Sequence, residues 1–391
     1  MAAQSYRIVR KKRRWFPEML ASVGDFTLQK DSVVDAGQVV ANPQISMYAA
    51  DSKNNTIVFV ETPPAVDLTS FPFLYLAQYE HATRVITLPC DEFISVMEAL
   101  PYPDKKYIFL YTVGRAGSTL MTNIFAGDHN TVSLSEPDIL AYLIPLFKGK
   151  PSQHAEGKKL LLSCLKLFSA NSAVPGKQRI LIKPRGFCIE FADMIHTVVP
   201  DARGVFLYRD AKPVIESFLR AFSFGAITNL LRDTAAMRFL LTIFIRAYRK
   251  KLTNYFPCFN EYADGTIYRT GWTGLLCIAW LSIMKSYCAL YRQGIPFQAV
   301  LYEDLIKHPQ EIISQLFEYC GIPAASIPTA LTALDRDSQE GTRLARSVAY
   351  KKKYLKKINT DHLALILKSQ AEINTTDYIV PGTISRTVAQ K

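Results

Sequence analysis

The stretch YIFLYTVGRAGSTL, residues 107–120, decides the fold. Its first seven residues are mostly apolar and predict a buried strand, which runs into a glycine-containing turn and then an apolar helical segment. The turn exposes backbone N–H groups, and the start of the helix adds partial positive charge. Ser118 and Thr119 add hydroxyl donors, and Arg115 adds a full charge with paired donors. The stretch therefore predicts an anion-binding loop, the alternative being an ordinary turn built from small residues.

The loop does not follow the pattern of ATPases and GTPases. That pattern places a lysine directly after the last glycine. Here the cation, Arg115, precedes Gly117. The sequence thus argues against nucleoside triphosphate hydrolysis.

Three more short apolar runs predict strands of the same sheet, at residues 179–182, 204–208 and 297–301. They alternate with longer helical patterns, among them a long buried helix over residues 273–291 and a helix from Pro309 that stops at Gly321. This alternation predicts an α/β fold with a parallel sheet flanked by helices, like that of P-loop nucleotide-binding proteins.

The first hundred residues have a different pattern. Short β-rich pieces, such as residues 56–60 and 85–88, are broken by Asn-Pro and Pro-Pro pairs. We therefore predict two domains: a smaller α/β or β-rich N-terminal region of unknown role over residues 1–100, and the main domain over residues 101–391.

Composition narrows the class of protein. The chain has 391 residues, of which 49% are hydrophobic and 20% charged, which excludes disordered and collagen-like chains. The longest nearly continuous apolar run, residues 272–284, is shorter than the roughly 20 residues that cross a bilayer. No apolar stretch follows the basic N-terminus, so we expect no secretory signal. Seven cysteines without a CxxC pair argue against a disulfide framework or a structural zinc site and favour the cytoplasm.

Two segments account for the net charge of +12. Residues 1–14 hold six basic residues and no acid, and residues 343–357 hold seven and no acid. The remaining 33 basic residues face 34 acids. Either the two segments are a solvated tail and a solvated helix face, or they bind an anionic partner, which would be nucleic acid, anionic lipid or a polyphosphorylated small molecule.

Two further motifs lie at predicted strand ends. Arg209 follows the strand 204–208, at the edge where open α/β sheets bind ligands, and Ser217 lies two turns into the next helix. Together they could hold a second phosphate, or Arg209 could be one partner of a surface ion pair beside an incidental serine. Glu303 and Asp304 follow the strand 297–301, where such acids more often cap a helix or pair with arginine than catalyse.

These three pieces, in this order, resemble the sulfotransferase superfamily that uses 3′-phosphoadenosine 5′-phosphosulfate (PAPS). Residues 114–120, GRAGSTL, resemble its 5′-phosphosulfate loop, and Arg209 with Ser217 resembles its 3′-phosphate motif. Residues 302–305, YEDL, before a helix that ends in GIP, resemble its late strand and helix. The resemblance covers roughly residues 105–345. It is closer to the carbohydrate and bacterial type than to the cytosolic small-molecule type, because the loop carries Arg115 in place of lysine.

The resemblance implies PAPS as co-substrate, without a metal. It implies that the loop holds the phosphosulfate and that Arg209 holds the 3′-phosphate. Residues 338–343, SQEGTR, resemble the late segment that covers the nucleotide. The expected nucleotide-binding residues are Arg115, Ala116, Gly117, Ser118, Thr119, Arg209, Ser217, Gly341, Thr342 and Arg343.

The expected catalytic residues are Glu136, Lys183 and Arg115. The Lys-Thr-His segment of the cytosolic type is matched here by residues 183–186, KPRG, which lack a histidine. Lys183 could therefore reach the transferring group, while Glu136 is our candidate for the general base, by analogy with the glutamate of carbohydrate and bacterial enzymes. The alternative for Glu136 is a solvated loop residue.

The resemblance implies sulfuryl transfer to a hydroxyl or amine of a small-molecule or glycan acceptor. It implies no nucleic-acid partner and no stable membrane span, and it leaves a homodimer open. Two alternatives remain: a non-catalytic nucleotide or anionic-glycan binder with the same fold, and another P-loop-type phosphotransferase.

Overall fold

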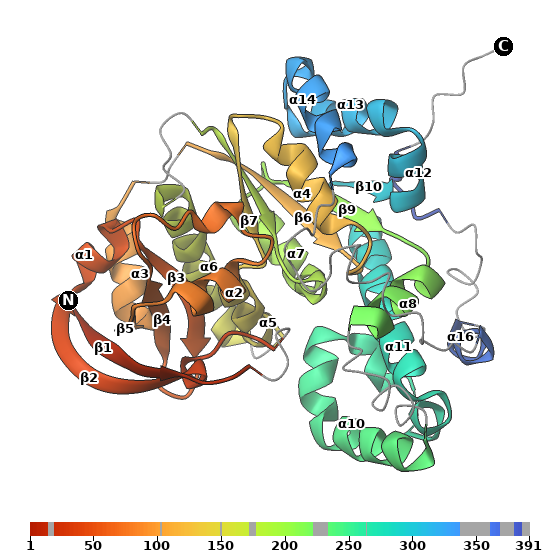
Figure 1. Ribbon diagram of the computed structural model, residues 1–391, viewed down its shortest axis with the longest axis horizontal. Coiled ribbons are helices and arrows are strands. Elements are labelled where there is room, and N and C mark those ends of the chain that lie inside the picture. Colours follow the sequence, from red (N-terminus) through yellow and green to blue (C-terminus); the bar gives the residue numbers. More distant parts are fainter. Residues whose placement is uncertain are drawn as a thin grey trace. The chain divides into compact units, whose positions relative to one another are not determined.

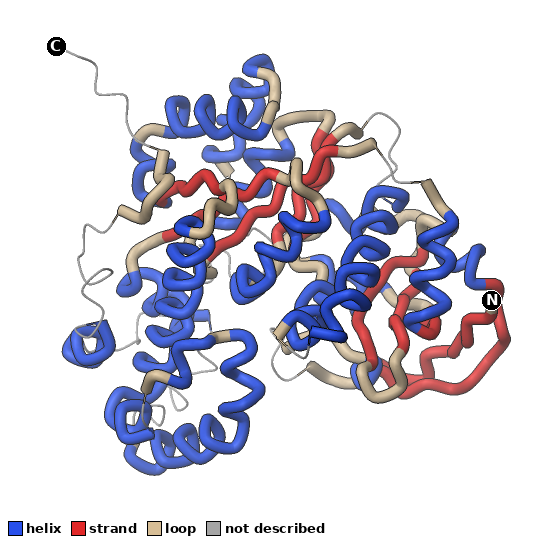
Figure 2. Tube along the Cα trace, turned by 180° about the vertical axis from the view of Figure 1, so that it is seen from behind, coloured by secondary structure: helices blue, strands red, loops and turns tan. Residues whose placement is uncertain are grey.

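The structure is a computed structural model of the chain. The residues it describes are 1–14, 19–101, 104–148, 151–171, 177–221, 234–262, 264–336, 360–367 and 379–384. They form two compact units that alternate along the sequence (Figures 1 and 2). Unit 1 comprises Met1–Phe109 and His129–Ala202, and unit 2 comprises Leu110–Asp128 and Arg203–Lys391.

An antiparallel sheet of five strands lies within the first hundred residues, in the order β2-β1-β5-β4-β3. Its strands are β1 (Ala2–Lys11), β2 (Phe26–Asp35), β3 (Ile45–Asp51), β4 (Thr56–Glu61) and β5 (Arg84–Pro89). Three helices accompany it: α1 (Ala36–Ala41), α2 (Leu74–His81) and α3 (Cys90–Ala99). The predicted β-rich pieces at residues 56–60 and 85–88 are confirmed as β4 and β5. The boundary at residue 100 stays a prediction.

The basic N-terminus is not a solvated tail. Residues 2–11 form β1, which pairs antiparallel with both β2 and β5. Tyr6 and Ile8 pack against the core of this sheet, whereas Arg7 is exposed. The tail interpretation was wrong because it considered the charge alone, whereas Tyr6 and Ile8 lie two residues apart on one side of a strand and contribute to the core.

A parallel sheet of five strands has the order β10-β9-β6-β8-β7. Its strands are β6 (Lys106–Thr112), β7 (Thr131–Ser135), β8 (Arg179–Lys183), β9 (Arg203–Tyr208) and β10 (Phe297–Leu301). All four predicted strands are confirmed to within one residue at each end. Phe109 of β6 pairs with Ile182 of β8, and Ser135 of β7 pairs with Lys183 of β8. The α/β fold with a helix-flanked parallel sheet is thus as predicted.

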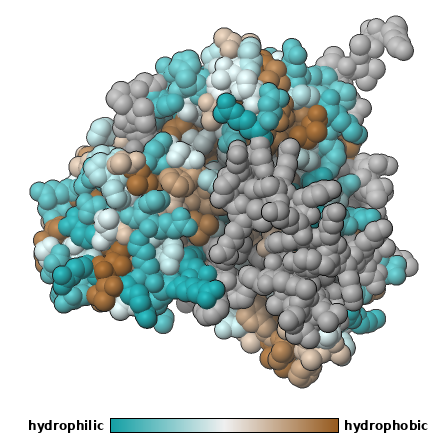
Figure 3. Space-filling model, in the orientation of Figure 1, coloured by the Kyte–Doolittle hydropathy of each residue, from teal (hydrophilic) through white to brown (hydrophobic). Residues whose placement is uncertain are grey.

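The remaining α-helices, in chain order, are α4 (Ser118–Ala126), α5 (Ile144–Phe147), α6 (Pro151–Asn171), α7 (Ala192–Val198), α8 (Ala211–Ala221), α10 (Ala235–Tyr255), α11 (Asp264–Arg292), α12 (Tyr302–Lys307), α13 (Pro309–Cys320), α14 (Ile327–Leu331) and α16 (Thr360–Leu367). α13 begins at Pro309 and ends at Gly321 in the left-handed conformation, as predicted. One face of α10 is apolar and exposed, at the lower edge of the view in Figure 3.

α11 is longer than the predicted helix over residues 273–291. It starts at Asp264 and contains a break at Gly271, whose φ of 56° is outside the helical range. Among the described helices, α11 alone is long and apolar enough to cross a membrane, and 67% of its most apolar segment is buried within the protein. A buried core helix meets the same criteria of length and composition, so these properties of α11 are only weak evidence for a membrane-spanning helix.

Candidate functional site: two charged clusters at strand ends

The loop after β6 has an unusual backbone. Gly114, Arg115 and Gly117 all have positive φ, at 75°, 52° and 85°. Glycine adopts this region freely, but a residue with a side chain does so under strain, which is typical of ligand-binding loops. Left-handed residues next to a helix start turn successive N–H groups toward one side, as in anion-binding nests. The predicted anion loop therefore has the backbone that such a site requires.

Two aromatic rings press against the glycines of this loop. A Cβ atom on Gly117 would lie 2.4 Å from the ring of Tyr302, and one on Gly114 would lie 2.7 Å from the ring of Phe218. Phe218 belongs to α8 and Tyr302 begins α12. Glycine is thus required twice over, by the backbone conformation and by the space available.

Arg115 joins the loop to the second predicted motif. Its Nε donates a hydrogen bond of 2.9 Å to Oγ of Ser217 on α8. We had expected the two residues to hold separate phosphates. The hydrogen bond instead places Ser217 beside the loop. Within the loop itself, Ala116 and Thr119 are buried and Ser118 is half-buried.

Arg209 lies at the end of β9 and is held on two sides. Its Nε donates a 2.8 Å hydrogen bond to Oε1 of Glu303, and its Cζ lies 4.5 Å from the centroid of the Tyr302 ring. The expectation that an acid after β10 pairs with arginine is confirmed for Glu303. Both side chains of the pair stay about a third exposed, at 27% and 33%. Because Tyr302 contacts both Gly117 and Arg209, the loop and the second motif surround one ring within unit 2.

Unit 1 holds the other two predicted catalytic residues as a pair. Lys183 ends β8, and Glu136 follows β7 with a φ of 57°. The backbone N–H of Glu136 donates a 2.6 Å hydrogen bond to the carbonyl of Lys183, and Nζ of Lys183 lies 3.2 Å from Oε1 of Glu136. Glu136 is therefore not a solvated loop residue.

Lys183 is a buried ammonium group. Its side chain is 1% exposed, and its Nζ makes no contact that has the geometry of a hydrogen bond. Nζ lies 5.4 Å from the centroid of the Phe73 ring, which comes from the first hundred residues. A buried charge with so few partners is costly for stability. A cation held at this cost is a candidate for function.

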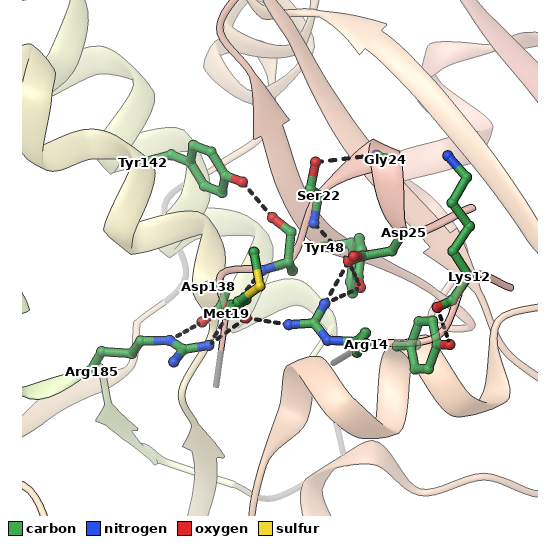
Figure 4. Close-up of polar contacts among 12 residues, drawn as sticks. Lys12, Arg14, Met19, Ser22, Gly24, Asp25, Tyr48, Asp138, Tyr142 and Arg185 are labelled. Atoms are coloured by element: carbon green, nitrogen blue, oxygen red, sulfur yellow. Dashed lines mark hydrogen bonds and ion pairs between the residues drawn. The ribbon is translucent and has the colours of Figure 1, made fainter. Parts of the chain in front are cut away.

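A second ion pair, between Arg185 and Asp138, lies two residues beyond Lys183 and Glu136 in the same two segments. Nε and Nη2 of Arg185 donate hydrogen bonds of 2.6 and 2.9 Å to the two carboxylate oxygens of Asp138, which is fully buried (Figure 4). Burial raises the pKa of Asp138, and Arg185 opposes that rise. The backbone N–H of Ala21 donates a further hydrogen bond of 2.7 Å to Asp138, and the guanidinium of Arg185 lies 4.3 Å from the ring centroid of Tyr75.

Sequence reasoning missed Asp138 and Arg185. Each lies two residues beyond a predicted catalytic residue, Asp138 three residues after the end of β7 and Arg185 two residues after the end of β8. The sequence therefore shows two opposite charges after strand ends, but the pairing of β7 with β8 is what brings them together.

Arg14 connects the N-terminal sheet to this cluster. It donates hydrogen bonds to Asp25, at 2.5 Å, and to the carbonyl of Met19, which also accepts from Arg185 at 3.3 Å (Figure 4). Tyr48 donates to the same carboxylate of Asp25 at 2.6 Å. Within unit 1, the N-terminal region is thus linked to Arg185, after β8, through the carbonyl of Met19.

The last part of the predicted site, Gly341, Thr342 and Arg343 with the basic stretch 343–357, lies outside the described residues. In the part of the chain that the structure describes, no group of three or more His, Cys, Asp or Glu side chains could hold a metal ion. All seven cysteines are buried, and none of them forms a disulfide.

No family model matches the sequence, and no curated protein sequence does. The chain is similar to solved bacterial sulfotransferases. One from Alicyclobacillus acidocaldarius aligns over 60% of this chain and 95% of its own, at 15% identity and a TM-score of 0.32. STF9 from Mycobacterium avium aligns over 72% and 80%, at 13% identity and 0.36. STF1 from Mycobacterium tuberculosis H37Rv aligns over 70% and 78%, at 11% identity and 0.34. At these values the likeness does not by itself indicate a shared activity.

Proposed function

We propose that the protein is a sulfotransferase that moves a sulfuryl group from PAPS to a hydroxyl or amine of a small-molecule or glycan acceptor. The hydrogen bond between Arg115 and Ser217 carries the proposal, because it joins two motifs that lie 102 residues apart and that a doubly phosphorylated nucleotide would need together. The contact of Tyr302 with both Gly117 and Arg209 supports it.

The residues of unit 2 fit the donor. In the proposed role, the left-handed loop and the start of α4 bind the phosphosulfate through backbone N–H groups, and α4 has no side chain that caps its first turn. Arg115 adds a charge that stabilises the negative charge developing on the leaving phosphate. Arg209 binds the 3′-phosphate, and Ser217 orients the guanidinium of Arg115 by accepting its hydrogen bond.

The reaction is an in-line displacement at sulfur. The acceptor oxygen or nitrogen forms a bond to sulfur while the bond from sulfur to the bridging phosphate oxygen breaks, and 3′-phosphoadenosine 5′-phosphate leaves with that electron pair. We propose that Glu136 takes the proton of the acceptor and that Lys183 neutralises charge on the transferring group. Glu136 follows β7 and Lys183 ends β8, and these two strands pair in parallel.

We further propose that the protein acts in the cytoplasm. The support is chemical: seven thiols, all buried and none in a disulfide, suit a reducing compartment.

Nucleotide binding tests the first half of the proposal. We expect 3′-phosphoadenosine 5′-phosphate to raise the melting temperature and Arg209→Ala to remove most of the rise. The control is Arg203→Ala, which removes an exposed arginine at the other end of the same strand, 5.4 Å from the ring centroid of Tyr319. An unchanged melting temperature of the unmodified protein at saturating nucleotide contradicts the proposal.

Transfer of labelled sulfate from PAPS to an acceptor panel tests the second half. We expect Glu136→Gln to lose turnover while its nucleotide affinity is kept. The salt bridge of Glu136 with Lys183 also suits one alternative, a non-catalytic binder, because it gives both side chains a structural role. Nucleotide binding without transfer to any acceptor would establish that alternative, and magnesium-dependent binding of ATP in preference to PAPS would establish a phosphotransferase.

A further inference from the structure

α10 carries an unusual surface for a helix on a folded domain. Five of its large apolar side chains are each between 49% and 58% exposed, and they recur with the spacing of one helix face: Phe239, Leu240, Ile243, Phe244 and Tyr248. We call these five residues the α10 stripe. In Figure 3 hydrophobic surface is visible at the lower edge of the view, where Figure 1 places α10.

The opposite face of the same helix is the one that packs. Leu241 and Ile245 are buried, and Arg249 donates hydrogen bonds of 2.9 Å to Asp264 and to the carbonyl of Tyr262. Nη1 of Arg238 donates to the carbonyl of Arg269 at the other end of the contact. α10 is therefore anchored to α11 by one face, and the α10 stripe is not needed to hold the helix in place.

The charge of α10 has one sign. Its 21 residues include five basic side chains and no acid. Arg246, Lys250 and Lys251 are exposed, and the side chain of Arg246 is 73% exposed. Asp264 on α11 pairs with Arg246 and Arg249 and offsets part of this charge. Phe, Leu, Ile and Tyr side chains flanked by Lys and Arg are the composition of helices that lie in a membrane interface.

We propose that the α10 stripe binds an anionic membrane surface, with the apolar side chains entering the boundary between headgroups and acyl chains and the flanking cations contacting lipid phosphates. A second copy of the chain is a less suitable partner for the α10 stripe than an anionic membrane. A two-fold interface places the same helix opposite itself, and α10 has no acid to pair with the cations of its copy. An anionic lipid surface supplies the missing negative charge.

Vesicle co-sedimentation of the full chain tests the proposal. We expect binding to vesicles of phosphatidylcholine containing about one quarter phosphatidylglycerol, and much weaker binding to phosphatidylcholine alone. Raising the salt from about 0.1 M to about 1 M shortens the Debye length from about 10 Å to about 3 Å and should weaken binding. The double variant Phe239→Ser/Phe244→Ser should bind anionic vesicles about tenfold less tightly or worse, because it removes buried apolar area from the complex.

The matched control is Val9→Ser/Val33→Ser, which removes two exposed apolar side chains from β1 and β2 and should leave vesicle binding unchanged. The melting-temperature rise with 3′-phosphoadenosine 5′-phosphate should be the same in both double variants, so failure of membrane binding and failure of the proposed enzyme activity are distinguishable. Absent vesicle binding, or binding that survives Phe239→Ser/Phe244→Ser, overturns the proposal. So does a dimer in light scattering that this variant abolishes, since the occupant would then be a second copy.

Discussion

Two charged clusters follow the strands of one parallel sheet, and they differ in how far water reaches them. In unit 2, Arg209 and Glu303 are each about a third exposed. In unit 1, Asp138 is fully buried and Lys183 is 1% exposed. Exposed ion pairs contribute little to stability, so an incoming anion can replace one partner at low cost. A buried pair cannot lose a partner without leaving an unpaired charge in a medium of low polarity. The first cluster suits binding, and the second suits a fixed geometry.

Removing the buried acid should give the largest effect on stability. We expect Asp138→Ala to lower the free energy of unfolding by about 3–5 kcal/mol, because it removes the carboxylate that accepts two hydrogen bonds from Arg185 and one from the N–H of Ala21. Urea denaturation measures this. The control is Glu98→Ala, which breaks the exposed salt bridge with Lys159 and should cost less than about 1 kcal/mol. Equal losses in the two variants would show that burial does not distinguish the clusters.

Lys183 should separate activity from stability within the same cluster. Lys183→Met replaces a buried ammonium that has no good hydrogen bond by an apolar chain, and its partner Glu136 is 19% exposed and so keeps contact with water. Unlike the loss of Asp138, this change should therefore lower the free energy of unfolding by no more than about 1 kcal/mol, or should raise it. Turnover in the sulfate-transfer assay should fall by about 10²–10³. Lys177→Met removes a lysine just before β8, whose Nζ donates to the carbonyl of His129, and should keep turnover. A Lys183→Met protein that turns over normally would make this charge purely structural.

The sheet and the loop could be predicted from the sequence because their signals are local. The strand over residues 106–112 is a run of apolar residues, and the turn after it is marked by two glycines. The pairing of Arg115 with Ser217 could not be predicted, since it joins residues far apart in sequence and depends on how α8 packs.

The buried cluster needed information that a single strand does not contain. Asp138 and Arg185 pair because β7 and β8 are neighbours in the sheet, and strand order is a tertiary property. The hydrogen bonds of Arg14 to Asp25 and to the carbonyl of Met19 could not be predicted either, because they too depend on tertiary packing. The basic N-terminus was interpreted by its charge, and its pairing with β2 and β5 likewise depends on partners that lie elsewhere in the sequence.

Two glycines with almost the same backbone can test the loop. Gly117 and Gly294 have φ of 85° and 82°, but a Cβ atom on Gly117 would meet Tyr302 and one on Gly294 would meet nothing within 4 Å. Gly294→Ala should therefore cost about 1–2 kcal/mol from backbone strain alone. Gly117→Ala should cost about 1–3 kcal/mol more from overpacking and should also weaken nucleotide binding, which calorimetric titration measures. Equal costs would mean that Tyr302 does not fix the loop.

The smallest expected effect is a gain in affinity for the nucleotide. Glu303→Gln keeps an oxygen that can accept the hydrogen bond from Nε of Arg209 but removes the negative charge that competes with a bound phosphate. Because the pair is partly exposed, we expect a gain of about 1 kcal/mol, or about fivefold tighter binding of 3′-phosphoadenosine 5′-phosphate, in calorimetric titration at constant salt. Asp304→Asn, which neutralises the next acid on α12, should change binding less. Weaker binding by Glu303→Gln would mean that the carboxylate orients Arg209 as Asp138 orients Arg185. The partly exposed pair of Arg209 and Glu303 in unit 2 would then need a fixed geometry as much as the buried pair of Arg185 and Asp138 in unit 1 does. The difference in burial between the two units would in that case not correspond to a difference in function.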